Sequence, residues 1–140
     1  MPFPIDLSPS TELLGRFHRT LMDRRASPSL EQLDASAYPD ELVEHARQQW
    51  AGRAVAEYQS TAQFSELLHR LCAWGAPVEL LGAATRLVTD ECRHAELCAR
   101  VAEQLGGRHG HEVPEQGLSL YADESDPLLA IYRTILSVCC

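Results

Sequence analysis

The chain contains no lysine, and all of its 12 basic residues are arginine. Set against 20 acidic residues, they leave a formal net charge of −8. Nucleic acids and anionic membranes both attract basic surfaces, so this balance is unfavourable for either partner. We therefore expect the protein to bind neither nucleic acid nor a membrane.

The chain also lacks long apolar runs. No stretch approaches the roughly 20 consecutive apolar residues that a membrane helix requires. The N-terminal residues 1–6, Met-Pro-Phe-Pro-Ile-Asp, have no basic segment followed by an apolar one, so they do not read as a signal peptide. These absences predict a cytoplasmic protein.

Cysteine is sparse and odd in number. Five cysteines are present, without the spacing of a zinc ribbon or the density of a disulfide framework. Cys92 and Cys98 would lie on one helix, too far apart along it to form a disulfide. We expect reduced and mostly buried thiols. The five residues are Cys72, Cys92, Cys98, Cys139 and Cys140.

Helix breakers are rare in the central part of the chain. From 40 to 74 there is no proline and one glycine, and apolar residues recur at helical spacing. Gly75-Ala76-Pro77 predicts a tight turn, and a second helix should end near Leu105, before Gly106. Two long helices joined by so short a turn must run antiparallel. The sequence therefore predicts an all-α fold built on a long helical hairpin.

The segments outside this hairpin are less regular. Residues 1–39 read as a lead-in that contains one short helix ending near Arg25, and residues 108–125 read as loop. A third helix should start at Asp126, and residues 40–140 should form one domain. This helix stops at Cys140 without any capping signal, so the domain looks incomplete at its C-terminus. Its apolar side should comprise Leu128, Leu129, Tyr132, Ile135, Leu136 and Cys139.

Three polar residues occupy apolar positions of the two long helices. Steps of four and three define a packing seam on each helix, and Glu57, Glu91 and His94 take seam positions. The first seam comprises Trp50, Ala54, Glu57, Thr61, Phe64, Leu68 and Leu71. The second comprises Leu80, Ala84, Leu87, Glu91, His94, Cys98, Val101 and Leu105.

Register places these three residues at one height. Glu57 lies 18 residues before Gly75, whereas Glu91 and His94 lie 16 and 19 residues after it. In an antiparallel hairpin they should meet within about one helical turn. Buried carboxylates are costly unless they are paired, and iron or manganese accepts carboxylate oxygen together with imidazole nitrogen. We therefore predict that Glu57, Glu91 and His94 are metal ligands.

The spacing Glu-x-x-His is weak evidence by itself, because Glu66 and His69 show it too. Those two fall off the seam, and we expect both to face solvent. Asp90 could orient His94 from behind, or could simply be an exposed acid. Tyr58, beside Glu57, is better explained by helix packing than by a role in the site. The pair His109 and His111, followed by Glu112, is better explained as surface loop.

A metal-free arrangement explains the same polar residues in another way. Glu57, Glu91 and His94 could form a hydrogen-bonded cluster with Arg53 or Arg93. The chain would then be a helical interaction module that associates with itself. Metal content is the observation that separates the two interpretations.

Residues 40–105 resemble the ferritin-like di-iron carboxylate superfamily. The resemblance rests on an inward Glu57, a short turn, and the segment Asp90-Glu91-Cys92-Arg93-His94, with Glu91 34 positions after Glu57. The complete family pattern repeats this arrangement on a third and a fourth helix. The present chain departs from it there, so the resemblance supplies half of a ligand set.

The resemblance implies a half bundle and half of a two-iron site, with iron as the metal and manganese as a possible alternative. It implies oxidation that depends on O₂, or oxidation of Fe(II); iron storage is a further family activity. Two explanations for the missing half stay open. Either the chain is the N-terminal part of a longer protein, or two chains pair as a homodimer or higher assembly.

Overall fold

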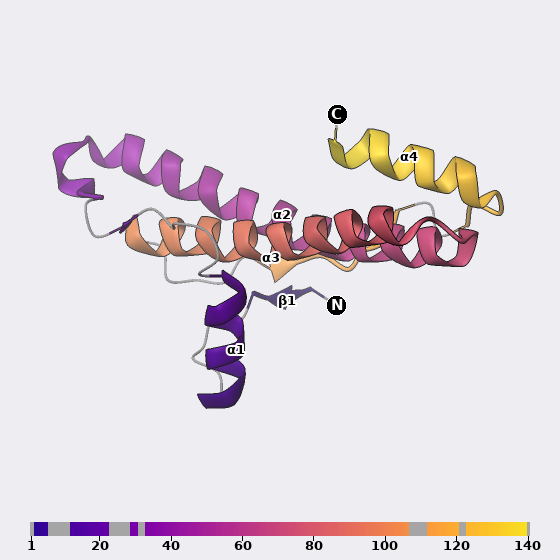
Figure 1. Ribbon diagram of the computed structural model, residues 1–140. Coiled ribbons are helices and arrows are strands. Elements are labelled where there is room, and N and C mark those ends of the chain that lie inside the picture. The colour runs from indigo at the N-terminus through magenta and orange to yellow at the C-terminus, as the bar shows by residue number, and fades with distance from the viewer. Residues whose placement is uncertain are drawn as a thin grey trace.

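The computed structural model describes residues 2–5, 12–22, 29–30, 33–106, 112–120 and 123–139. It confirms the predicted all-α fold, which a long helical hairpin dominates (Figure 1). None of the helices among these residues is long and apolar enough to cross a membrane. Among the described residues, the α-helices are α1 (Glu12–Met22), α2 (Asp40–Trp74), α3 (Val78–Gln104) and α4 (Pro127–Cys139), and Ala35–Ala37 form the 3₁₀ turn η2.

The turn between α2 and α3 is built on Gly75. Its φ of 78° lies in the left-handed region, which only glycine adopts without a steric penalty. The N–H of Ala76 donates to the carbonyl of Leu71 at 3.0 Å, and this bond closes the last turn of α2. Pro77 then precedes α3. Proline has no backbone N–H, and the first turn of a helix does not require one. The predicted hairpin is confirmed to within a few residues at each end.

Helix α4 packs against the part of the hairpin near this turn (Figure 1). The Asp126 carboxylate caps its N-terminus by accepting from the N–H of Leu128 at 2.9 Å. The buried residues of α4 are Ala130, Ile131 and Thr134. The core that Ile131 joins contains Phe64, Leu67, Leu71, Ala76 and Ala84.

The predicted apolar side of α4 faces solvent, because the smaller Ala130 and Thr134 lie on the buried side of the helix. Tyr132 is 59% exposed and Leu128 is 50% exposed. The other exposed members of this face are Leu129, Ile135 and Leu136.

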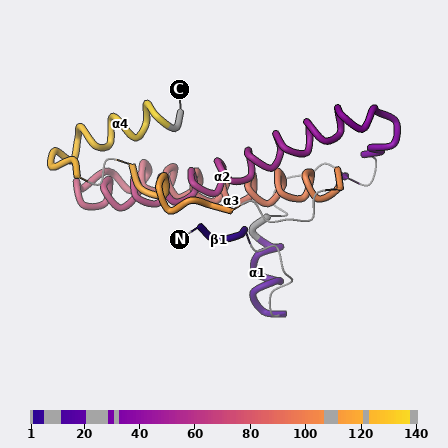
Figure 2. The backbone as a smooth tube through the Cα atoms, turned by 180° about the vertical axis from the view of Figure 1, so that it is seen from behind, coloured from indigo at the N-terminus to yellow at the C-terminus, as the bar shows by residue number. Residues whose placement is uncertain are grey.

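The N-terminal region lies on the opposite side of the hairpin from α4 (Figure 2). Strand β1 (Phe3–Pro4) pairs antiparallel with β2 (Glu112–Val113). The sequence analysis assigned residues 108–125 to loop and therefore missed β2; two residues are too few to show a strand period. Helix α1 contacts α3 through His18 Nε2 and Glu96 Oε2, 2.8 Å apart. Residues 23–25 of the predicted first helix lie outside the described ranges.

The two predicted seams are only partly buried. Ala54, Phe64 and Leu71 are buried as expected, but Trp50, Leu80 and Leu87 are 39%, 44% and 39% exposed. The N-terminal part of α2, which carries Trp50, diverges from α3, as Figures 1 and 2 both show. A two-helix pair can cover only one face of each helix, so the remaining apolar positions face outward.

The thiols also differ from expectation. Cys98 is buried, but Cys72 and Cys92 are exposed, so the prediction of mostly buried cysteines is wrong for the two that lie away from the interhelical contact. All three are free thiols, as predicted. Cys139 and Cys140 fall at the end of the chain, and nothing is described of their side chains.

Candidate metal centre

The structure brings Glu57, Glu91 and His94 together. One ligand atom from each residue lies within 4.8 Å of the other two. His94 Nδ1 is 3.6 Å from Glu91 Oε2 and 3.9 Å from Glu57 Oε2. The three residues that register selected from the sequence are therefore the ones whose donor atoms converge.

Small side chains allow α2 and α3 to approach each other closely beside these three residues. Ala54 is fully buried one turn before Glu57 and forms a cluster with Cys98 and Ala99 of α3. Because these residues are small, the two backbones approach each other just beside the acidic pair. Glu91 and His94 lie three apart on α3 and therefore project from one face toward Glu57. Local helix geometry and a tight interhelical contact thus position all three donors.

The two carboxylates are largely removed from solvent, whereas the imidazole is not. The side chain of Glu57 is 16% exposed, that of Glu91 is 15% exposed, and that of His94 is 48% exposed. Their polar ends line an open cleft of about 620 Å³ on the surface of the hairpin. The cleft makes the donor atoms accessible to an ion or small molecule from solution.

Burial and the proximity of Glu57 alter the titration of Glu91. Burial, contact with the Glu57 carboxylate, and the negative charges of Glu57 and Asp90 raise the pKa of Glu91 to about 7. The positive charge of Arg53 lowers the pKa of Glu91 but does not outweigh these effects. Carboxylates this close favour either a shared proton or a bound cation. A divalent ion at this point would replace the proton.

Arg53 provides part of the metal-free arrangement considered above. Its Nε donates to Glu57 Oε1 at 3.2 Å, one turn away on α2. The Arg53 side chain is nevertheless 68% exposed, so water screens this pair strongly. The Arg53 pair engages one oxygen of Glu57, and Oε2 of the same carboxylate faces His94. The pair is therefore compatible with a metal on the His94 side.

The neighbours of the cluster have identifiable partners. Tyr58 packs its ring edge-to-face on Phe3 with centroids 5.7 Å apart, as expected for a packing residue. Asp90 Oδ2 lies 3.5 Å from Arg86 Nε. A role for Asp90 in orienting His94 stays a prediction. Burial, reinforced by the charge of Glu57, raises the pKa of the Cys98 thiol, which keeps this neighbour neutral.

The second Glu-x-x-His pair does not form a comparable cluster among the described residues, but Glu66 is not solvated as predicted. Its carboxylate accepts from Ser119 Oγ at 2.7 Å and pairs with Arg70 at 2.6 Å. Burial alone would raise the pKa of Glu66, but these hydrogen bonds outweigh it and lower the pKa. Glu66 thus fastens the 115–120 segment to α2. His69 is exposed, as expected.

The cleft beside the three donors was not predicted from the sequence. Gly52, Ala56 and Ser60 follow one another at four-residue steps on α2 and line its wall. Their small size at helical spacing was the available signal, and it was not used. His109 and His111 lie outside the described residues, and Glu112 is exposed on β2.

Comparison of the chain with protein-family models, with curated proteins and with solved structures gave no match. The resemblance to the ferritin-like superfamily therefore stays a prediction that rests on the residues themselves. The geometry of Glu57, Glu91 and His94 is the basis for assigning a function to the chain.

Proposed function

We propose that this protein binds a divalent transition metal, with Glu57, Glu91 and His94 as ligands. The observation that carries the proposal is the convergence of two largely buried carboxylates and one imidazole within 4.8 Å. Two such carboxylates repel each other unless a proton or cation lies between them. Burial, and then contact with Glu57, raise the pKa of Glu91.

The donor set favours iron or manganese. Carboxylate oxygen and imidazole nitrogen together suit Fe(II) and Mn(II), and thiolate is not required. Three protein donors leave open positions on an ion that takes roughly four to six ligands. The open positions face the cleft, where a small oxidant or substrate could reach them. Oxidation that depends on O₂, or oxidation of Fe(II), is the reaction class that we propose.

A second copy of the chain would complete a two-metal site. One chain offers a single glutamate on α2 and a Glu-x-x-His pair on α3. Two chains would offer the four carboxylates and two imidazoles of a bundle-type two-iron centre. The iron pair would supply the redox chemistry, while Glu57, Glu91 and His94 hold it and the paired helices exclude water.

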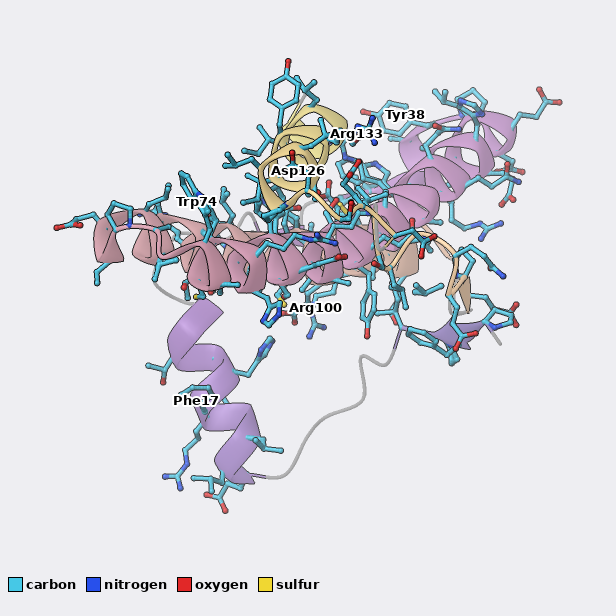
Figure 3. The ribbon with its side chains drawn as sticks, turned by 90° about the vertical axis from the view of Figure 1, so that its right-hand side faces the viewer. Phe17, Tyr38, Trp74, Arg100, Asp126 and Arg133 are labelled. Atoms are coloured by element: carbon cyan, nitrogen blue, oxygen red, sulfur yellow. The ribbon has the colours of Figure 1, made fainter. Side chains whose placement is uncertain are left out.

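Exposed apolar surface supports such self-association. Trp74 projects from the hairpin on the side that carries α4, and Phe17 is exposed on α1 (Figure 3). Apolar side chains such as these would be covered if two chains paired. The large apolar residues of the hairpin exposed by more than a third are Leu42, Trp50, Trp74, Val78, Leu80 and Leu87.

Metal titration tests the proposal directly. Calorimetric titration with Mn(II), and with Fe(II) under anaerobic conditions, should give about one ion per chain, or two per dimer. Substituting Glu91 and His94 by alanine should abolish binding. His69→Ala, in the other Glu-x-x-His pair, is the matched control and should bind as the wild type does.

Two outcomes would contradict the assignment. Unchanged binding in the Glu91→Ala/His94→Ala variant would place the ion elsewhere. Failure of the folded wild type to bind either metal would favour the second candidate function, a metal-free helical interaction module. The outward apolar face of α4 is the observation that favours this second function. Circular dichroism of each variant separates loss of ligands from loss of fold.

A further inference from the structure

A second cleft adjoins the candidate metal centre. It has a volume of about 490 Å³ and lies between the N-terminal half of α2 and the C-terminal half of α3. Glu57 and His94 line both clefts, so a molecule in the second cleft would touch the metal ligands. Its volume falls in the range of roughly 300–1,000 Å³ that is typical of small-molecule sites.

Toward the N-terminal end of α2, the two long helices diverge (Figure 1). They are still in contact at Ala54, which is fully buried and packs with Cys98 and Ala99 of α3. One turn further along α2, Trp50 is 39% exposed and lines the cleft. The indole therefore forms a wall of an open wedge instead of filling a core.

The inner surface of the cleft is apolar. Leu97 and Cys98 of α3 line it opposite Trp50, and Cys98 is 5% exposed. Burial raises the pKa of the Cys98 thiol and keeps it uncharged, so it acts as a small apolar residue there. An aromatic or aliphatic group would exchange water for contact with Trp50, Leu97 and Cys98.

The polar end of the cleft carries a cation. Arg53 lines it, and its Nε donates to Glu57 at 3.2 Å. A guanidinium has further N–H donors in a planar fork, and the Arg53 side chain is 68% exposed. Such a fork matches the two oxygens of a carboxylate. Arg53 therefore adjoins both the apolar wall and Glu57, one of the proposed metal ligands.

We propose that the second cleft binds a small organic carboxylate, with its apolar body against Trp50 and Leu97 and its carboxylate between Arg53 and the metal. This inference rests on the proposed function, since Glu57 and Glu91 would repel an anion in the absence of a metal. It names the ligand class of the site: a monocarboxylate with a short aryl or alkyl chain.

The experiment uses the full chain, Mn(II) and 3-phenylpropionate as the probe. Calorimetric titration of the Mn(II)-loaded protein with the probe should show saturable binding that the metal-free protein lacks. The neutral amide of the same acid should bind at least about tenfold more weakly, since it loses a charge-assisted bond to Arg53.

Two substitutions locate the probe. Arg53→Gln and Trp50→Ala should each weaken probe binding by roughly tenfold, through loss of the charged contact and of the aromatic wall. Arg47→Gln and Trp74→Ala are the matched controls, because they change the same residue types outside this cleft and should leave probe affinity unchanged. The affinity for Mn(II), measured on each variant, reports whether the ligand set is intact.

The possible results separate the two proposals. Mn(II) binding through Glu91 and His94 without probe binding would overturn the carboxylate site and leave the metal proposal standing. Equal affinity for the acid and its amide, or probe binding unaffected by Arg53→Gln, would likewise overturn it. Absence of Mn(II) binding by the folded protein would overturn both.

Discussion

Glu57 and Glu91 face each other across the hairpin, one from each long helix, and both side chains are about 15% exposed. Burial, together with the adjacent Glu57 carboxylate, raises the pKa of Glu91 from its ordinary value of 4.5 to about 7. Without a metal, the folded chain thus holds a proton that the unfolded chain would release. Metal binding and folding stability are both linked to this one proton.

The first prediction concerns the stability of the metal-free protein. A raised carboxyl pKa means that the contribution of Glu91 to stability is present below pH 4.5 and is lost as the pH rises through 7. Glu91→Gln removes this loss, because the amide stays neutral and can still donate to Glu57. Above pH 7 the variant should be more stable than the wild type by about 1–2 kcal/mol, after discounting for solvent in the open cleft.

Urea unfolding from pH 4.5 to 8 in the presence of a chelator measures this difference. The two proteins should have similar midpoints at the acidic end and diverge as the pH rises. The acidic end is the internal control for any packing change. Parallel profiles over the whole range would show that Glu91 titrates normally in the folded state.

The second prediction concerns proton release on metal binding. An ion bound to Glu91 requires the carboxylate form, so binding below pH 7 must displace the proton held there. Affinity should fall by up to about tenfold per pH unit below 7 from this group. Calorimetry at pH 6 and pH 8, in buffers of different ionisation enthalpy, counts the protons released. A count that does not decrease toward pH 8 would argue against Glu91 as a ligand.

The sequence was sufficient for the hairpin and for the three donors, and the reason is geometric. Helix propensity predicts α2 and α3, and Gly75 predicts the turn between them. Residues at equal distances from this turn then lie at the same height along the hairpin. Register therefore distinguished Glu91 and His94 from Glu66 and His69, although both pairs have the same spacing. Local rules sufficed because the partner helix is a neighbour in the chain.

The rest depends on which faces find a partner, and periodicity does not encode that. The apolar residues of α4 were grouped on one side of the helix from the sequence, but the sequence did not indicate that the buried side would be that of Ala130 and Thr134. Glu66 is half-buried because Ser119, 53 residues away, donates to it. Strand β2 depends on a partner 110 positions away in the sequence, since Phe3 of β1 pairs with Val113.

The third prediction concerns the outward face of α4. Replacing Leu136, which is 45% exposed, by glutamate places a charge on an apolar surface without touching the core beneath Ala130 and Ile131. If this face joins two chains, the dissociation constant should rise by roughly tenfold or more, given the energy of burying one leucine. Analytical ultracentrifugation over a concentration series measures this dissociation constant.

Thr20→Glu, on exposed α1 across the hairpin, is the control of equal charge. Equal association of both variants would exclude α4 as the contact.

The fourth prediction compares two glycines with opposite expectations. Gly75 has a φ of 78°, so Gly75→Ala forces a side chain into the left-handed region and should cost about 1–2 kcal/mol of folding free energy. Gly82 lies inside α3, where a Cβ would meet no atom within 4 Å, so Gly82→Ala should gain about 0.5–1 kcal/mol from helix propensity. Urea unfolding of both variants gives the sign of each change in the free energy of unfolding. Shifts in the same direction would show that the turn does not hold Gly75 in the left-handed conformation, and the level register of Glu57 with Glu91 would lose its structural basis.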